Sequence, residues 1–224
     1  SKIKKGIYQI NKEEEILGIN TPLDLIKVTN LLSSKINQNL RKNNVFVNKA
    51  QIGPDVKITP GVKISDNSII LGNTIIEGNT YIIDSLIEDS KIISSIIGPY
   101  AHLKHSIIEE STIGNFVEVK NSEIKKQVKA KHLSYIGNAL IEDGVNIGAG
   151  VIFSNFDGKI KSRSKVGSYS FIGSNSTIIA PITIGSNCYI GAGSEVTSSL
   201  NDNTFYLRGN EKRALNKKLI EKKE

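Results

Sequence analysis

Residues 166–196 read VGSYSFIGSNSTIIAPITIGSNCYIGAGSEV. An aliphatic residue stands at every sixth position of this stretch, and the same period opens the first half of the chain. The positions are Val166, Ile172, Ile178, Ile184, Ile190 and Val196, and earlier Ile52, Ile58, Ile64, Ile70, Ile76 and Ile82. A period of six fits neither a helix of 3.6 residues per turn nor a two-residue strand alternation. The pattern predicts a hexapeptide β-solenoid in which the first residue points into a narrow triangular core and the fifth fills its corner.

The solenoid is expected to occupy residues 46–201, between two smaller segments. Residues 21–43 read as a helix, with Thr21 as N-cap, Pro22 at the first helical position and an apolar stripe. The stripe comprises Leu23, Ile26, Leu31, Ile36 and Leu40. Residues 202–224 are expected to leave the coil as a basic tail that ends in a short helix. The hexad phase slips near residues 83–136 and again at 153–165, where a loop is expected to bulge from the coil.

Composition narrows the classes of function. The net charge is +7, but much of the lysine lies at the two ends, and no zinc-knuckle spacing or aromatic ladder suggests nucleic-acid binding. No apolar run approaches the roughly 18 residues of a membrane span, and no signal-peptide pattern opens the chain. A soluble cytoplasmic protein is therefore expected, and a polyanionic small molecule suits the excess of positive charge as well as nucleic acid does. Because the sequence contains no methionine, we expect it to be a processed protein or, in preference, a fragment of a longer one.

Polar residues that could carry chemistry gather around the phase slips. His132 lies in KAKHLSYIGNA, with Lys120 upstream and Tyr135 and Asn146 downstream. A histidine on a solenoid is more often an incidental surface residue than a base. Lysines, a phenol, an amide and a GAG turn within a few coils, however, supply the contacts that a phosphorylated ligand needs. Cys188 stands at the fifth position of its hexad, where a small residue packed in the core is expected.

These stretches carry a family resemblance. The segments IGPYAHLK, GNFVEVK, KAKHLSYIGNA, GVNIGAG, NFDG, FIGSNSTIIAPITIG and IGAGSEV together resemble the C-terminal acetyltransferase domain of the bifunctional N-acetylglucosamine-1-phosphate uridyltransferase/glucosamine-1-phosphate N-acetyltransferase. The resemblance implies an all-β fold, a left-handed parallel β-helix with an N-terminal linker helix and a short C-terminal helix. It also implies acetyl transfer from acetyl-CoA to the amine of glucosamine 1-phosphate, on the route to UDP-N-acetylglucosamine.

Matched position by position, the resemblance assigns roles to individual residues. His132 matches the family's general base, and Glu118 is a candidate to orient its imidazole. The sugar phosphate is expected to meet Lys104, Lys120, Tyr135 and Asn146.

The cosubstrate positions follow in the same way. Acetyl-CoA is expected to contact Ala149, Asn155, Phe156, Ser174, Ala192 and Arg208, in a groove between subunits of a homotrimer. Small side chains suit this path because the thin pantetheine arm must approach the backbone closely. The match of Arg208 requires one deleted residue.

The sequence departs from the family pattern at two of these positions. Lys104 replaces an arginine, which keeps a cation but loses the bidentate fork. Phe156 replaces a tyrosine, which loses one hydroxyl. Upstream, residues 1–45 resemble the end of the uridyltransferase domain and its linker helix. There Asn20 matches a ligand of the Mg²⁺ that serves the missing uridyltransferase site, so the sequence predicts no metal site of its own and no uridyltransfer.

Two other classes of function were compared with this interpretation. The γ-type carbonic anhydrases share the solenoid and bind zinc through three histidines, but the separations of His102, His105 and His132 do not match their pattern. A trimerisation scaffold with a decayed site is the more serious alternative. Lys104 and Phe156 favour it, whereas the presence of His132, Lys120, Tyr135 and Asn146 favours an enzyme.

Overall fold

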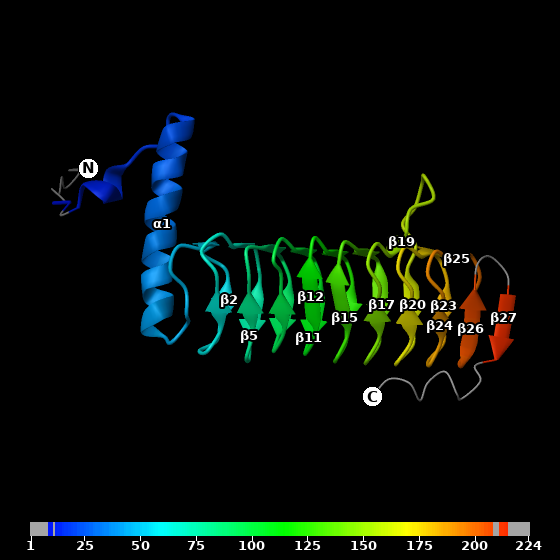
Figure 1. Ribbon diagram of the computed structural model, residues 1–224. Coiled ribbons are helices and arrows are strands. Elements are labelled where there is room, and N and C mark those ends of the chain that lie inside the picture. The colour runs from blue at the N-terminus through cyan, green and yellow to red at the C-terminus, as the bar shows by residue number, and fades with distance from the viewer. Residues whose placement is uncertain (1–8, 11, 208–210, 215–224) are drawn as a thin grey trace, which may run out of the picture.

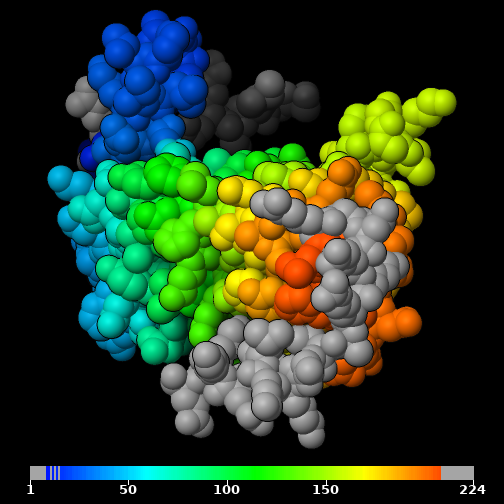
Figure 2. Space-filling model, turned by 45° about the vertical axis from the view of Figure 1, so that its right-hand side comes forward, coloured from blue at the N-terminus to red at the C-terminus, as the bar shows by residue number. Residues whose placement is uncertain are grey.

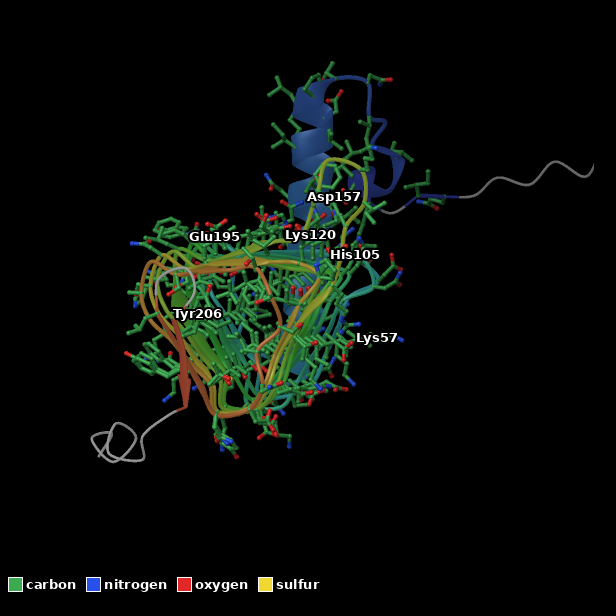
Figure 3. All side chains as sticks on the ribbon, turned by 90° about the vertical axis from the view of Figure 1, so that its right-hand side faces the viewer. Lys57, His105, Lys120, Asp157, Glu195 and Tyr206 are labelled. Carbon is green, nitrogen blue, oxygen red and sulfur yellow. The ribbon has the colours of Figure 1, made fainter. Side chains whose placement is uncertain are left out.

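Short parallel strands stack into three sheets, which form the three faces of a left-handed β-helix (Figure 1). This computed structural model describes residues 9–10, 12–207 and 211–214. Viewed down its axis, the coil is triangular, with Lys120 on one face and Lys57 on the next (Figure 3). The expected all-β fold class is confirmed.

We number the faces I to III in the order in which the chain visits them. Face I consists of β1 (Gln51–Ile52), β4 (Ile69–Leu71), β7 (Leu86–Glu88), β10 (His102–Lys104), β13 (Glu118–Lys120), β16 (Tyr135–Gly137), β19 (Ile152–Ser154), β22 (Thr177–Ile179) and β25 (Glu195–Val196). Face II consists of β2 (Lys57–Ile58), β5 (Ile75–Glu77), β8 (Lys91–Ile93), β11 (Ile107–Glu109), β14 (Glu123–Ile124), β17 (Ala139–Ile141), β20 (Ser164–Val166) and β23 (Thr183–Ile184). Face III consists of β3 (Lys63–Ile64), β6 (Tyr81–Ile82), β9 (Ile96–Ile97), β12 (Thr112–Asn115), β15 (Lys129–His132), β18 (Asn146–Ile147), β21 (Phe171–Ile172), β24 (Tyr189–Ile190), β26 (Thr204–Leu207) and β27 (Glu211–Ala214).

The core is a column of mostly aliphatic side chains, and most of them follow a buried small or β-branched residue two positions earlier. Pairs such as Ser68 with Ile70 and Thr74 with Ile76 are almost completely buried. The aliphatic member fills the centre, and the small member fills the corner, as the hexad pattern predicts. Cys188 occupies one such corner, where its thiol donates to the carbonyl of Asn201 at 3.1 Å. Burial raises the pKa of the Cys188 thiol, which agrees with a packing role.

The phase slip after residue 82 shortens the sides of the triangle without opening the coil. Core positions follow one another at intervals of five from Ile82 to Ile97, and at intervals of five or six from there to Phe153. The shorter sides turn through one residue in the left-handed conformation, such as Asp84 at φ 39° and Asp89 at φ 45°. Acidic and amide side chains tolerate this conformation better than most. The coil length therefore varies along the solenoid, which changes the residues that stack on each face.

The helix α1 (Pro22–Lys42) caps the first coil and has the predicted N-terminus. The Thr21 hydroxyl accepts from the Asp24 amide at 3.2 Å, and the Asp24 carboxylate accepts from the Thr21 amide at 2.9 Å. Only the C-terminal part of α1 contacts the coil, where Asn37 donates to the carbonyl of Ala50 at 2.8 Å. A short 3-10 helix, η1 (Glu13–Ile16), precedes it.

The predicted apolar stripe of α1 is only partly correct. Ile36 and Leu40 pack against the core, and Leu31 is half-buried. Leu23 and Ile26 are 69% and 55% exposed because the N-terminal half of the helix extends beyond the solenoid.

The end of the solenoid also corrects the sequence prediction. The chain does not leave the coil at residue 202. β26 pairs with β24, and Tyr206 fills the core as its hydroxyl donates to the carbonyl of Glu195 at 2.6 Å. Residues 211–214 form an antiparallel strand against β26. Residues 215–224, at the end of the tail where a short helix was predicted, lie outside the described part of the chain.

A loop between β19 and β20 projects from the solenoid, as the break in the repeat predicts. Residues 155–163 rise on the same side as α1, near the opposite end of the coil (Figures 1 and 3). The space-filling view shows the blue helix and the yellow-green loop as two separate projections from the body (Figure 2). Face I lies between these two projections.

Candidate functional site

Several predicted ligand-binding residues share the outer surface of face I. The strand register pairs Lys104 with Lys120 and Lys120 with Gly137, while Glu118 pairs with Tyr135. Neighbouring strands lie about 4.8 Å apart, so the two lysines and the phenol stand on adjacent strands of one surface. We call Lys104, Glu118, Lys120 and Tyr135 the face I floor. It offers two cations and a phenol to a ligand, beside one carboxylate.

The two lysines of the floor differ in their partners. Lys104 Nζ lies 3.2 Å from Glu88 Oε1, and His102 Nε2 lies 3.1 Å from Glu88 Oε2. These contacts, with the hydrogen bond from His102 first, hold the pKa of the Glu88 carboxyl below its ordinary value. Lys120 makes no ion pair within the described residues. Its ammonium group is therefore the less committed of the two cations.

The predicted base stands at the edge between faces III and I. His132 is the last residue of β15, and its side chain is exposed. Leu133 and Ser134 then carry the chain around the edge to Tyr135 on face I. Neither His132 nor Glu118 makes a side-chain hydrogen bond within the described range, so the orienting role of Glu118 stays a prediction.

Three of the predicted cosubstrate residues form a column on the same edge. The Asn175 amide donates to the carbonyl of Ala149, and the Gly193 amide donates to the carbonyl of Ser174, both at 2.8 Å. Ala149, Ser174 and Ala192 therefore occupy equivalent turns of successive coils. The register that pairs Ala130 with Ile147 extends to place His132 one coil before Ala149. The edge thus presents a path of small side chains that leads to the predicted base.

Asn155 and Phe156 lie on the other edge of face I, where the projecting loop begins. Asn155 is 7% exposed, and its amide donates to Asn138 Oδ1 at 2.8 Å and reaches the Tyr135 hydroxyl at 3.5 Å. A Cβ at Gly137 would lie 2.6 Å from this amide, so glycine leaves room for it beside Tyr135. Within one chain these two residues are separated from the Ala149 column by the width of face I.

Asn146 is the predicted sugar-binding residue that a single chain leaves apart from the others. It lies on face III, paired with Lys129 on one side and Phe171 on the other. It lines a hollow of about 460 Å³ at the edge between faces II and III. The hollow is lined by Glu110, Ser111, Thr112, Gln127, Val128, Lys129, Gly144, Asn146 and Tyr169. The face I floor and this hollow therefore open on different sides of the solenoid.

The projecting loop carries charged and apolar groups away from the body. The Asp157 carboxylate accepts from the amides of Ile160 and Lys159, both at 2.8 Å, and these bonds lower its pKa. Ile160 is 63% exposed. Arg208, the last predicted cosubstrate residue, lies outside the described part of the chain.

Some residues of this region were not identified from the sequence. Glu88 and His102 are 14 positions apart, and Gly137 and Asn138 follow Tyr135 without a recognisable motif. To predict these neighbours from the sequence, one would need the number of residues in each coil, which varies along this stretch. Over the described residues there is no group of three or more acidic, histidine or cysteine side chains that could hold a metal, and no helix long and apolar enough to cross a membrane.

Comparison with known proteins gives results that agree with the repeat. Residues 163–198 match the family described as bacterial transferase hexapeptide (six repeats). The chain is 41% identical over 226 residues to the bifunctional protein GlmU of Caldicellulosiruptor saccharolyticus, with 90% of this chain and 49% of the relative covered. It is 39% identical over 216 residues to GlmU of Streptococcus mutans, with 86% of this chain and 47% of the relative covered. The chain therefore spans about half the length of these curated relatives.

Among solved structures, LpxA from Acinetobacter baumannii aligns with a TM-score of 0.44 and 15% identity. The alignment covers 76% of this chain and 73% of that one.

Proposed function

This chain is a hexapeptide-repeat β-helix whose sequence is related, along nine-tenths of its length, to the C-terminal half of bifunctional GlmU, and from that premise we propose that it is a glucosamine-1-phosphate N-acetyltransferase. It would transfer the acetyl group of acetyl-CoA to the amine of glucosamine 1-phosphate and form N-acetylglucosamine 1-phosphate. The observation that carries the proposal is the position of His132, on the edge that joins the column of small residues to the two-lysine floor of face I.

The floor suits a phosphorylated amino sugar. Lys120 is a half-buried residue of the floor without an ion-pair partner in the described range, so its charge is available to the phosphate. Lys104 stands on the neighbouring strand and adds a second cation. The Tyr135 hydroxyl accepts a hydrogen bond from the Asn155 amide at 3.5 Å, so its own proton remains able to bond to a sugar or phosphate oxygen.

His132 suits the proton transfer that this reaction requires. The lone pair of the glucosamine amine attacks the thioester carbonyl, and a neutral imidazole accepts the proton that the nitrogen loses as it becomes an amide. The new C–N bond forms as the C–S bond breaks, and the proton held by the imidazole can pass to the departing thiolate. Cys188 is buried and points into the core, so direct attack by the amine is preferred to an acyl-enzyme.

The edge column suits the cosubstrate. Ala149, Ser174 and Ala192 project no more than two side-chain heavy atoms each, which leaves the turn backbone open to a thin chain. An extended pantetheine arm laid along these turns would point its thioester toward His132, one coil away. Asn155 and Phe156 would meet the cosubstrate from the opposite edge of face I, which requires a second copy of the chain.

A homotrimer with shared sites follows from the same division of residues. Tyr100, Phe116 and Leu133 are 58%, 58% and 61% exposed on the edge that carries His132, and the first two rings stack at 5.3 Å. We call these three residues the apolar ridge. A neighbouring copy that covered the ridge could bring its own Asn146 or loop toward His132.

The distribution of charge favours the same arrangement. Face II carries ion pairs along its length, between Lys91 and Glu77, Lys125 and Glu109, Arg163 and Glu123, and Lys165 and Glu142. This face suits solvent, while the less charged faces I and III suit contact with neighbours. Sedimentation equilibrium should give three times the chain mass of 24.5 kDa, and a monomer at working concentration would contradict the shared site.

The proposed function is tested by acceptor-dependent release of CoA thiol. The chain should release thiol from acetyl-CoA with glucosamine 1-phosphate and far less with glucosamine 6-phosphate, because the floor and His132 fix the distance between phosphate and amine. Equal release with both acceptors would contradict the proposed acceptor. Silence from a folded trimer would favour the trimerisation scaffold instead.

Substitution of Lys120 should weaken acceptor binding more than chemistry. Lys120→Ala removes the uncommitted cation, and loss of a hydrogen bond to a charged group costs about 1.5–3 kcal/mol, or roughly 10- to 150-fold in KM for glucosamine 1-phosphate. KM for acetyl-CoA should stay near the wild-type value. Lys57→Ala, on face II, is the matched control and should leave both constants unchanged. A wild-type acceptor KM in Lys120→Ala would contradict the placement of Lys120 in the acceptor-binding site.

A further inference from the structure

Glu88, His102 and Lys104 form a cluster at the N-terminal side of the face I floor. One carboxylate oxygen contacts the imidazole at 3.1 Å, and the other contacts the ammonium group at 3.2 Å. The three side chains are 23%, 39% and 33% exposed, so they are partly screened from solvent. Glu88 therefore bonds to both groups at once and holds Lys104 in an ion pair.

Few other charged groups face this cluster. Glu118 and Lys120 face it from β13, paired with His102 and Lys104 respectively, and Glu88 is the only charged residue that β7 contributes. At the adjoining edge of face I, His105 lies 3.9 Å from Asp89 (Figure 3). With a neutral imidazole, the two lysines of the floor are balanced by the carboxylates of Glu88 and Glu118.

A phosphate group over the floor must compete with Glu88 for Lys104. The pKa of Glu88 is lowered, so this carboxylate stays charged at neutral pH and does not release the lysine by taking up a proton. Imidazole is the side-chain group that generally changes charge near neutral pH, and His102 supplies one to this cluster. A protonated imidazole would satisfy the carboxylate by itself and leave one net positive charge on the floor.

We propose that Glu88 and His102 are positioning residues that control, through the charge on the imidazole, how far Lys104 is available to the phosphate of the acceptor. The proposal rests on the proposed function because it concerns the same floor. Acceptor binding should strengthen as His102 gains a proton and weaken as the pH rises and the neutral imidazole returns. Removal of the Glu88 charge should free Lys104 at every pH.

The test compares acceptor affinity between pH 6 and 8.5 in four proteins: wild type, Glu88→Gln, His102→Gln and Glu109→Gln. Glu109→Gln breaks a comparable ion pair, with Lys125 on face II, and serves as the matched control. Both KM and kcat are measured with glucosamine 1-phosphate, and its binding is measured by calorimetry without acetyl-CoA. The second proton of the phosphate itself titrates near pH 6, and the control variant reports this shared background.

The proposal predicts three patterns. Glu88→Gln should lower acceptor KM at pH 8 by about two- to fivefold, the range expected for a partly exposed ion pair, with kcat unchanged. His102→Gln should keep the weaker binding of the neutral imidazole across the whole range. Wild type and Glu109→Gln should bind the acceptor as tightly as Glu88→Gln at the low end of the pH range. As the pH rises, their binding should weaken to that of His102→Gln.

The contrary outcomes separate this proposal from the proposed function. An unchanged or raised KM in Glu88→Gln would overturn the control of Lys104, because Glu88 would then not compete with phosphate. If the wild type shows no turnover but calorimetry gives the three expected patterns of acceptor binding, the proposed acetyltransferase activity is overturned and this proposal stands. No binding of the acceptor by the wild type would overturn both.

Discussion

Replacement of His132 by alanine should lower kcat by about 10²- to 10⁴-fold, the usual contribution of a well-placed general base. The residue stands at the exposed end of β15, and its side chain makes no hydrogen bond within the described part of the chain. The variant should therefore keep the wild-type melting temperature, trimer mass and acceptor KM. Thiol release under saturating acetyl-CoA and glucosamine 1-phosphate measures kcat.

The matched control for this prediction is His105→Ala. His105 is also exposed and stands at an edge of face I, but it lies at the turn after β10, toward face II. The His105→Ala variant should have a kcat close to the wild-type value. A wild-type kcat in His132→Ala, or an equal loss of kcat in both variants, would contradict the role of His132 as the general base.

The second large effect concerns stability. Ile124 lies in the core on β14, fully buried between Ile108 and Ile141 in the stack. Ile124→Ala should lower the free energy of unfolding by about 2–5 kcal/mol, because a thin aliphatic core cannot collapse to fill the cavity. Chemical denaturation monitored by circular dichroism gives the value.

An isoleucine on the same face supplies the comparison. Ile107 is on the adjacent strand but is 38% exposed, since its side chain points outward. Ile107→Ala should change the unfolding free energy by no more than about 0.5 kcal/mol. Equal destabilisation by both substitutions would contradict the assignment of inward and outward positions.

The sequence predicted the core more fully than the surface. The hexad period identifies Ile70, Ile76 and Ile82 as buried because the first position of each repeat has one possible environment. It does not show that the coil shortens after residue 82, because a five-residue side preserves the inward residue and removes only one turn residue. The residues that lie side by side on the outer surface depend on the number of residues in each coil.

The pairing of Glu88 with Lys104 illustrates this limit. The two residues are 16 positions apart, whereas three full hexads would place stacked residues 18 positions apart. The same limit explains why the ion pair between Lys104 and Glu88 was not predicted. The C-terminal end of the coil was harder still to predict. Tyr206 in the core and a ring stack of Phe205 on Tyr189 at 5.1 Å hold β26 in place, and neither contact follows from the hexad repeat.

The most direct test of the acetyltransferase is the fate of a labelled acetyl group. The chain is incubated with [¹³C-acetyl]-CoA and glucosamine 1-phosphate, and the product is examined by NMR and mass spectrometry. The account predicts the label in an amide on the sugar nitrogen, with one CoA thiol released for each N-acetylglucosamine 1-phosphate formed. Label in free acetate or in an ester, or unreacted acetyl-CoA beside a folded trimer, would contradict it.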